Sequence, residues 1–198
     1  MAKGLLRYAR KNKESRADST ISEFLTYTKP GRLLLIGLGI ARDAVDAEKR
    51  GFKVTAVDTD YASIREAKPE SKSIDFRTDF FSYAKTAAKD SFDVIIDSGF
   101  SHTLKKQRVE RFFHVLAKLL KHNGILFVKA YSDADEYAKK HCPKRKWTTI
   151  DGKYFYFFSN EELQAIIRKH GYDIISHELI QCERRSHAIE ARLRITKL

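Results

Sequence analysis

Short apolar runs alternate with segments of helical periodicity along most of the chain. The apolar runs predict five strands, at residues 32–36, 53–57, 73–77, 92–96 and 125–130. The segments that follow the first four strands predict helices at residues 41–50, 61–68, 80–89 and 105–121. Gly124, just past the last of these helices, is expected to end it. Continuous apolar strands separated by helices are typical of a parallel sheet with helices on both faces.

The C-terminal part of the chain follows a different pattern. Ser159 and Glu162 form a capping box that opens a helix, and Gly171 closes it. Two strand-like runs, residues 172–181 and 188–195, are then joined by a short charged link, a spacing that suits a β-hairpin. The prediction is an α/β fold: a Rossmann-like, doubly wound, mostly parallel seven-stranded sheet with a C-terminal antiparallel hairpin.

The domain organisation follows from where polar and apolar segments lie. Residues 1–30 are polar and charged, and we interpret them as a basic N-terminal arm with a short helix around residues 19–28. Residues 31–198 are expected to form a single domain, since 42% of the 198 residues are hydrophobic, enough for one core. Within it, the lysine-rich residues 133–153 are expected to form a long loop near the carboxyl edge of the strands.

Composition excludes several classes of protein. No apolar run approaches the roughly 18 residues of a membrane span, and residues 1–16 lack the apolar stretch of a signal peptide. Cys142 and Cys182 form no C-x-x-C motif, so we expect a protein of the reducing cytoplasm without disulfides. No metal-ligand spacing occurs among the seven histidines, and no metal is expected. The net charge of +12 favours anionic partners but does not bear on the fold.

The turn after the first predicted strand is the natural place for a ligand. Gly37-Leu38-Gly39 lets the backbone approach a bound molecule, and Asp58, 21 residues after Gly37, can accept both hydroxyls of a ribose. These features fit a dinucleotide or S-adenosylmethionine (SAM). A dinucleotide fingerprint needs glycine or alanine at the position that Arg42 occupies, so the pattern favours SAM.

Aspartates lie at the ends of three of the predicted strands. Asp58, Asp79 and Asp97 come at the ends of the second, third and fourth strands, and carboxyl ends of parallel strands share one edge of a sheet. Together with the glycine turn they indicate one binding site. The alternative for a single aspartate is a helix N-cap, which Asp60 and Asp79 would both suit.

These motifs resemble those of class I SAM-dependent methyltransferases. LLLIGLGIARDAV resembles the family's glycine motif, VTAVDTD its ribose-binding motif, SIDFRTDFF its adenine-contacting segment, and FDVIIDSGFSHTL the fourth-strand motif beside the transferred methyl. The resemblance implies cofactor contacts from Gly37, Leu38, Gly39, Arg42, Asp58, Thr59, Asp79, Phe80 and Asp97. The Arg42-Asp43-Ala44 step and the segment from Asp97 to Leu104 look most like the tellurite-resistance and thiopurine methyltransferase group, a resemblance that implies a small-molecule acceptor. Leu35 and Ala41 depart from the family's acidic residue and third glycine.

Methyl transfer from a sulfonium is an in-line displacement, for which holding the nucleophile against the methyl supplies most of the acceleration. A base is needed only where the acceptor must lose a proton early. His102 follows the fourth strand, near the expected position of the methyl, and is our candidate base, with Asp97 beside the same site. The alternative for His102 is a structural hydrogen bond at the start of the helix over residues 105–121.

Aromatic side chains in the irregular segment after the fifth strand are candidates for holding the acceptor. Tyr131, Trp147 and Tyr154 flank the basic residues 144–146 and can stack on a planar ring. The alternative is that residues 154–158 form a short strand that packs its alternate side chains.

Two further functions remain open. Residues 1–16 and 105–121 each carry a net charge of +5, which would suit an RNA or DNA substrate, and Asp97, Lys129 and Glu190 resemble three members of the Lys-Asp-Lys-Glu set of ribose 2′-O-methyltransferases. The departures at Leu35 and Ala41 would suit a non-catalytic binding module with the same fold.

Overall fold

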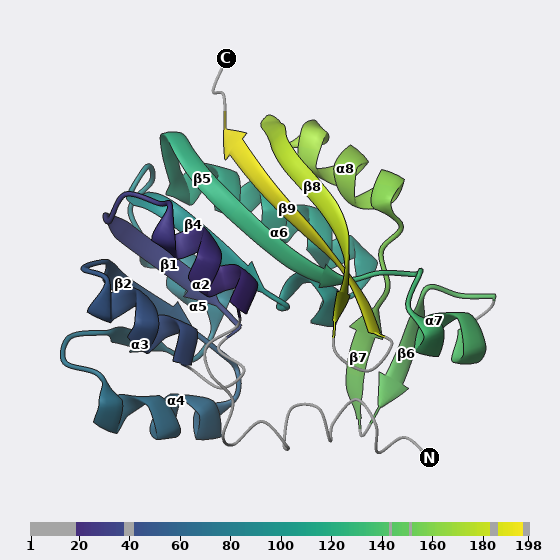
Figure 1. The fold of residues 1–198 in the computed structure, drawn as a ribbon, viewed down its shortest axis with the longest axis horizontal. Coiled ribbons are helices and arrows are strands. Elements are labelled where there is room, and N and C mark those ends of the chain that lie inside the picture. The colour runs from purple at the N-terminus through teal and green to yellow at the C-terminus, as the bar shows by residue number, and fades with distance from the viewer. Residues whose placement is uncertain (1–18, 38–41, 143, 151, 183–185, 196–198) are drawn as a thin grey trace. The chain divides into compact units, whose positions relative to one another are not determined.

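The computed structural model describes residues 19–37, 42–142, 144–150, 152–182 and 186–195, and it divides into two compact units, residues 1–87 and 88–198. Each unit is a set of strands with helices packed on it (Figure 1). None of the helices in the described ranges has the length and apolar character that a membrane span requires.

The first unit contains three parallel strands in the order β3-β2-β1. They are β1 (Arg32–Ile36), β2 (Lys53–Val57) and β3 (Asp75–Arg77). The helices are α2 (Ser19–Thr26), α3 (Arg42–Lys49), α4 (Tyr61–Ala67), the 3-10 turn η2 (Lys68–Glu70) and α5 (Phe80–Thr86). The predicted alternation of strands and helices is thus confirmed here, with α5 ending three residues earlier than predicted.

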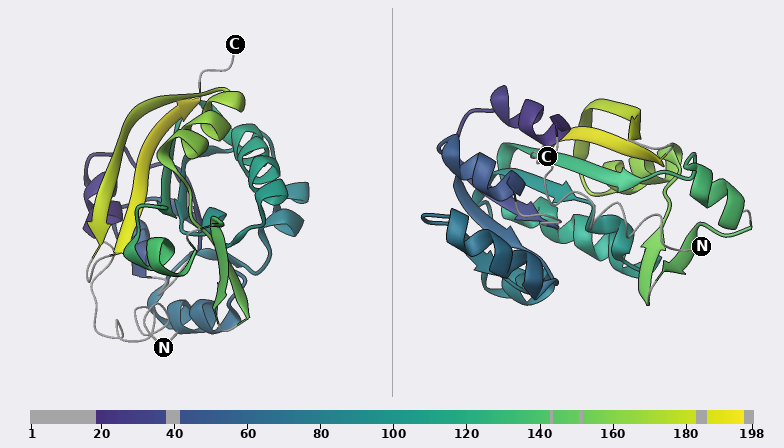
Figure 2. Two further views of the ribbon diagram at one scale, coloured as in Figure 1. Left: turned by 90° about the vertical axis from the view of Figure 1, so that its right-hand side faces the viewer. Right: turned by 60° about the horizontal axis from the view of Figure 1, so that its bottom comes forward.

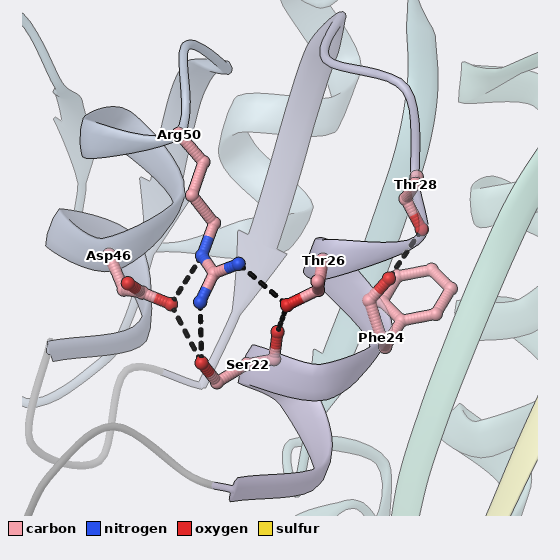
Figure 3. A network of polar contacts seen from close by, with 6 residues as sticks. All are labelled: Ser22, Phe24, Thr26, Thr28, Asp46 and Arg50. Carbon is pink, nitrogen blue, oxygen red and sulfur yellow. Dashed lines mark hydrogen bonds and ion pairs between the residues drawn. The ribbon is translucent and has the colours of Figure 1, made fainter.

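Helix α2 is fastened to α3 by one arginine (Figure 3). The guanidinium of Arg50 donates to Asp46 Oδ2 at 2.9 Å, to Ser22 Oγ at 2.7 Å and to Thr26 Oγ1 at 2.7 Å. Ser22 in turn donates to Asp46 at 3.1 Å. On its other side α2 buries the apolar residues Ile21, Phe24 and Leu25. The short helix predicted before the first strand is therefore an integral part of the first unit.

The second unit contains four strands in the order β4-β5-β9-β8. They are β4 (Phe92–Ser98), β5 (Leu120–Tyr131), β8 (Tyr172–Cys182) and β9 (Ser186–Ile195). Strands β4 and β5 are parallel, whereas β9 is antiparallel to both β5 and β8, which confirms the predicted C-terminal hairpin. Helices α6 (Lys106–Leu119) and α8 (Asn160–Lys169) contact one another and pack on one face of these strands (Figure 2).

Two predictions for this unit are wrong in detail. Gly124 does not end α6, because that helix stops at Leu119 and Gly124 lies inside β5. The strand begins early because Leu120 pairs with Phe92, and the register then shifts before Val94 pairs with Ile125. The shift is accommodated by Asn123, which has a φ of 61°.

The predicted loop over residues 133–153 is instead partly regular. Asp135 accepts hydrogen bonds from the N–H groups of Tyr137 and Ala138 and so caps α7 (Glu136–His141). Strands β6 (Trp147–Ile150) and β7 (Lys153–Tyr156) then form an antiparallel hairpin. Both elements lie beyond the carboxyl end of β5 (Figures 1 and 2). The short strand considered as an alternative for residues 154–158 is therefore present, over Lys153–Tyr156.

Candidate functional site

The ends of the three strands in the first unit are tied to one another by backbone hydrogen bonds. Gly37, directly after β1, has a φ of 84°, a conformation that favours glycine. Its N–H donates to the carbonyl of Val57 at 2.9 Å, which brings it beside Asp58. The N–H of Asp58 donates to the carbonyl of Arg77 at 3.1 Å. The carboxyl edge of this unit therefore brings together Gly37, Asp58 and the start of the segment that leads to Asp79, as predicted from the sequence.

The carboxylate of Asp58 is held at this edge by its own turn. The side chain is buried, and its Oδ1 accepts the N–H of Asp60 at 2.8 Å. A carboxylate fixed in this way beside a glycine turn can accept hydrogen bonds from the hydroxyls of a sugar without first being ordered. The geometry thus fits the predicted ribose-binding role. Thr59, between the two aspartates, is exposed.

The two other candidate aspartates of the first unit are helix caps. Asp60 accepts the N–H of Ala62 at 3.0 Å at the start of α4, and Asp79 accepts the N–H of Ser82 at 2.6 Å at the start of α5. The N-cap alternative therefore describes what both side chains do in this structure. A contact between Asp79 and a cofactor stays a prediction.

The remaining cofactor-binding candidates of this unit differ in accessibility. Arg42 is half-buried at the first position of α3, whereas Phe80 at the start of α5 is buried and packs edge to face against Phe81, with ring centroids 5.2 Å apart. Leu38 and Gly39 lie outside the residues that the structure describes. Leu35, which replaces an acidic residue of the resembling family, is fully buried in β1 and pairs with Ala56.

In the second unit, Asp97 organises the loop that follows β4. Its side chain is fully buried, and Oδ1 accepts the N–H groups of Phe100 at 2.8 Å and Ser101 at 3.1 Å. These bonds, with Gly99 at a φ of 81°, turn the chain into the 3-10 helix η3 (Ser101–Thr103). In the described part of the chain, Asp97 Oδ2 has no hydrogen-bond partner. Burial raises the pKa of Asp97 to about 6, opposed by the side chain and N–H of Ser101 and by the N–H of Phe100.

His102, in η3, lies against the end of β5. Its ring stacks on Tyr131, with centroids 4.0 Å apart and planes at 21°, and its Nδ1 accepts the N–H of Tyr131 at 3.4 Å. Phe155 of β7 lies on the same cluster, 6.0 Å from the His102 ring. Burial lowers the pKa of His102 to about 3, so the imidazole is neutral near pH 7. This geometry matches the structural hydrogen bond named as the alternative, and a base role stays a prediction.

The three predicted acceptor-binding aromatics fall into two groups. Tyr131 lies with His102 and Phe155, whereas Trp147 stacks with Tyr154 at a centroid distance of 5.7 Å. The guanidinium of Arg145 lies 4.4 Å from the centre of the Trp147 ring. Alternation along β7 accounts for the division, because Tyr154 and Phe155 point to opposite faces of the hairpin.

The contacts of two residues of this region were not predicted from the sequence. Phe155 is one of the aromatic residues of the segment expected to contact the acceptor, but its place beside His102 was not predicted, and the period-two alternation around it was the available signal. Glu162, recognised only as part of a capping box, accepts the hydroxyl of Tyr156 at 2.7 Å and pairs with Lys106 at 2.9 Å and Lys146 at 3.2 Å. These partners come from β7, α6 and the segment before β6, so no local pattern indicated them.

The basic run over residues 105–121 is partly neutralised in the structure. Lys106 pairs with Glu162, and Lys121 pairs with Asp93 at 2.7 Å. Residues 1–16, the other basic run, lie outside the described residues. The charges of residues 105–121 therefore give less support to a nucleic-acid partner than their number in the sequence indicated.

The register of the strands also bears on the Lys-Asp-Lys-Glu resemblance. Lys129 pairs with Glu190 across β5 and β9, but across β4 and β5 it pairs with Ser98, while Asp97 pairs with Val128. Neighbouring residues on a strand point to opposite faces, so Asp97 and Lys129 lie on different faces of the sheet. The three residues are therefore not gathered on one face. In the described ranges, no group of three His, Cys, Asp or Glu side chains is placed to hold a metal ion.

Comparisons with known proteins give a consistent result. The family model described as "Methyltransferase domain" matches residues 7–177. The fold is similar to the 1,6-didemethyltoxoflavin-N1-methyltransferase of Burkholderia thailandensis, solved with 1,6-didemethyltoxoflavin and S-adenosylhomocysteine, with a TM-score of 0.74 and 18% identity over 90% of this chain and 78% of that one. It is also similar to a SAM-dependent methyltransferase of Methanosarcina mazei, with a TM-score of 0.73 and 15% identity over 91% and 99%. The comparison with curated protein sequences gave no match.

Proposed function

Because the chain belongs to the methyltransferase-domain family, we propose that it transfers a methyl group from SAM to a small-molecule acceptor. The family match confirms the predicted class, an α/β SAM-dependent methyltransferase with SAM as its cofactor. The acceptor and the residues that bind each substrate are the proposed part. We also propose that residues 31–198 form one domain with a single seven-stranded sheet. The similarity of the Burkholderia fold over 90% of the chain supports this.

The observation that carries the proposal is the position of Asp58 beside Gly37. The backbone bond from Gly37 to Val57 and the turn from Asp58 to Asp60 fix a buried carboxylate next to a glycine with a φ of 84°. These residues fit an adenosine, with the ribose hydroxyls donating to Asp58. Leu38, Gly39, Arg42, Thr59, Asp79 and Phe80 complete the proposed cofactor contacts, and the buried Phe80 would act mainly by placing the start of α5.

Methyl transfer requires the chain mainly to position the methyl donor and the acceptor. When bound, SAM supplies an electrophilic methyl group on a sulfonium sulfur. The acceptor would then have to be held in line with that methyl and shielded from water, and this placement supplies most of the acceleration. Asp97 contributes by fixing the loop over residues 98–103 through its two backbone hydrogen bonds. We propose that the aromatic cluster of Tyr131, His102 and Phe155 forms part of the acceptor site.

Two findings favour a small molecule over a nucleic acid. The Burkholderia enzyme of similar fold was solved with 1,6-didemethyltoxoflavin, and the aromatic side chains clustered here are of the kind that stack on a planar ring. In addition, part of the positive charge of residues 105–121 is paired with carboxylates of the chain itself. Nucleic-acid binding would require those lysines to exchange one partner for another.

Titration calorimetry with SAM tests the cofactor half of the proposal. We expect the unaltered chain to bind and Asp58→Ala to bind at least 10-fold more weakly, because a hydrogen bond to a charged group contributes about 1.5–3 kcal/mol. Asp60→Ala is the matched control, since it removes an exposed carboxylate two residues away that caps α4. Equal losses in the two variants, or no binding by the unaltered chain, would contradict the assigned site.

Tritiated SAM tests the acceptor half. The chain is incubated with a cell extract that is afterwards divided into small-molecule, RNA, DNA and protein fractions. Label in the small-molecule fraction supports the proposal. Label confined to RNA, DNA or protein overturns it in favour of a macromolecular acceptor, and the absence of label from every fraction would favour a non-catalytic module.

A further inference from the structure

The ring of His102 is held on three sides. Tyr131 stacks on one face at 4.0 Å, and Phe155 lies 6.0 Å away. Gly99 closes the third side, since a Cβ at that position would lie 2.8 Å from His102 Cε1. Gly99 also has a φ of 81°, so glycine is favoured there for two separate reasons. The ring therefore has one defined orientation.

The hydrogen bond at Nδ1 decides where the ring carries its proton. Nδ1 accepts the backbone N–H of Tyr131 at 3.4 Å, and a nitrogen that accepts a hydrogen bond carries no proton. A neutral imidazole must then carry its hydrogen on Nε2. Within the described residues, no hydrogen bond from the protein to Nε2 is found, and His102 as a whole residue is 8% exposed. Nε2–H is thus the polar group of the ring that still needs a partner.

We propose that His102 acts in the acceptor site as a neutral hydrogen-bond donor through Nε2–H and takes no proton from the acceptor. This inference rests on the proposed methyltransferase function. It assigns the acceptor to a chemical class: a planar compound whose attacking atom already has an available lone pair, such as an unprotonated ring nitrogen or a carboxylate or phenolate oxygen. Acceptors such as aliphatic alcohols, which need a base before they attack, are excluded.

The electron count of the transfer is complete without a base from the protein. The lone pair of the acceptor atom forms the new bond to the methyl carbon, and the carbon–sulfur bond breaks with its electron pair left on sulfur. A neutral ring nitrogen gains one positive charge, and where that ring bears an N–H, water takes the proton afterwards. An anionic oxygen becomes a neutral ester or ether.

The surroundings of the ring oppose the protonated state that a base would have to reach. An imidazolium would present Nδ1–H to the N–H of Tyr131, so two donors would face each other. Its other contacts are the aromatic rings of Tyr131 and Phe155, and in the described part of the chain no carboxylate touches it. The low pKa of about 3 that burial gives His102 agrees with this geometry.

Nitrogen-15 NMR of the histidine side chains tests the assignment without any acceptor. His102→Gln identifies the resonance by its loss. We expect protonated Nε2 and unprotonated Nδ1 near pH 7, with no change down to about pH 5, below the ordinary histidine pKa of about 6.5. A proton on Nδ1, or titration between about pH 5.5 and 8, overturns the proposal.

Two variants test the role in catalysis with tritiated SAM and the labelled small-molecule fraction. Glutamine places an amide N–H near the position of Nε2, so His102→Gln should keep activity within about 10-fold. Asparagine places an oxygen near Nδ1 and loses the donor, so His102→Asn should lose roughly 10- to 100-fold, the effect of one hydrogen bond that positions the acceptor through a group other than its attacking atom.

If His102 were a general base, the activities of the two variants would differ from this expectation, because neither the glutamine nor the asparagine amide can take a proton. Both variants would then lose about 10²- to 10⁴-fold, and that result refutes the donor role. Circular dichroism and SAM affinity equal to the unaltered chain show that each variant is folded. Failure of the unaltered chain to bind SAM would count against the proposed function, whereas the NMR result would still decide the state of His102.

Discussion

Glu162 links three elements of the second unit, and its loss gives the sharpest test of how the β6–β7 hairpin is held. The carboxylate accepts the Tyr156 hydroxyl at 2.7 Å and pairs with Lys106 at 2.9 Å and Lys146 at 3.2 Å. Its side chain is 16% exposed, but those of Lys106 and Lys146 are 68% and 42% exposed. The two ion pairs are therefore screened by water, and each contributes at most about 1 kcal/mol.

The tyrosine contact is the larger contribution. A hydrogen bond to a charged acceptor contributes about 1.5–3 kcal/mol, and glutamine at position 162 would replace it with a neutral one of about 1 kcal/mol. Adding the two screened ion pairs, we expect Glu162→Gln to lower the free energy of unfolding by about 2–3 kcal/mol. Glu161→Gln is the control: it changes the same residue type one position earlier, where the side chain is exposed, and should cost less than about 0.5 kcal/mol.

Urea unfolding followed by circular dichroism measures the global effect, and fluorescence measures the local one. Trp147 is the only tryptophan of the chain and lies in β6, so quenching of its fluorescence by acrylamide reports on the hairpin alone. We expect stronger quenching in Glu162→Gln than in Glu161→Gln at urea concentrations that leave both folded. Similar stability and quenching in the two variants would refute the reasoning.

The pH dependence of the same pair of variants gives an independent check. Burial alone would raise the pKa of Glu162, but hydrogen bonds from Tyr156, Lys106 and Lys146 together lower it by more, so the pKa of Glu162 lies below its ordinary value. A carboxyl group with a lowered folded-state pKa stabilises above its unfolded-state pKa of about 4.3 and loses that effect as the pH falls. The difference between the unaltered chain and Glu162→Gln should therefore shrink in acid.

Two further predictions concern the loop after β4. Gly99→Ala should destabilise the chain by about 1–3 kcal/mol and displace His102, because the new Cβ would lie 2.8 Å from His102 Cε1. The control Gly152→Ala, at a φ of 74° with nothing within 4 Å of the new Cβ, should cost less. Thermal unfolding distinguishes the two variants, and equal shifts in melting temperature would contradict the predicted contact. Burial raises the pKa of Asp97 to about 6 in the folded chain from 3.8, so its ionisation should lower the free energy of unfolding by roughly 3 kcal/mol as the pH rises from about 4 to 7. The free energy of unfolding of Asp97→Asn should not show this decrease. Parallel profiles of unfolding free energy against pH for the two proteins would show that Asp97 titrates normally.

The order of strands and helices was readable from the sequence because each depends on local pattern. The apolar runs of β1 and β2 match the predicted bounds, and the capping box at Ser159 opens α8 as expected, with Glu162 N–H donating to Ser159 Oγ at 3.3 Å. The placing of Gly37 beside Asp58 was also predictable, since parallel strands end at one edge.

The errors have two different causes. Glycine is a common residue at the end of a helix, but pairing of Leu120 with the distant Phe92 starts β5 four residues before Gly124. Residues 133–153 have the composition of a loop, yet Asp135 caps α7, and the pairing of Trp147 with Tyr156 forms a hairpin. The cap and the hairpin are local features that the lysine-rich composition of this segment concealed.

The charges relevant to function also depend on contacts that the sequence does not show. The net charge of +12 and the basic run on α6 are properties of composition, but Lys106 and Lys121 are paired with Glu162 and Asp93, so part of that charge serves the fold. For His102, the residue type titrates near neutrality, and its place after the fourth strand indicated a candidate base. The N–H of Tyr131 at Nδ1 and the burial of the ring are the observations from which we propose a neutral donor instead. The chemistry available to the acceptor therefore follows from the protonation state that the surroundings impose.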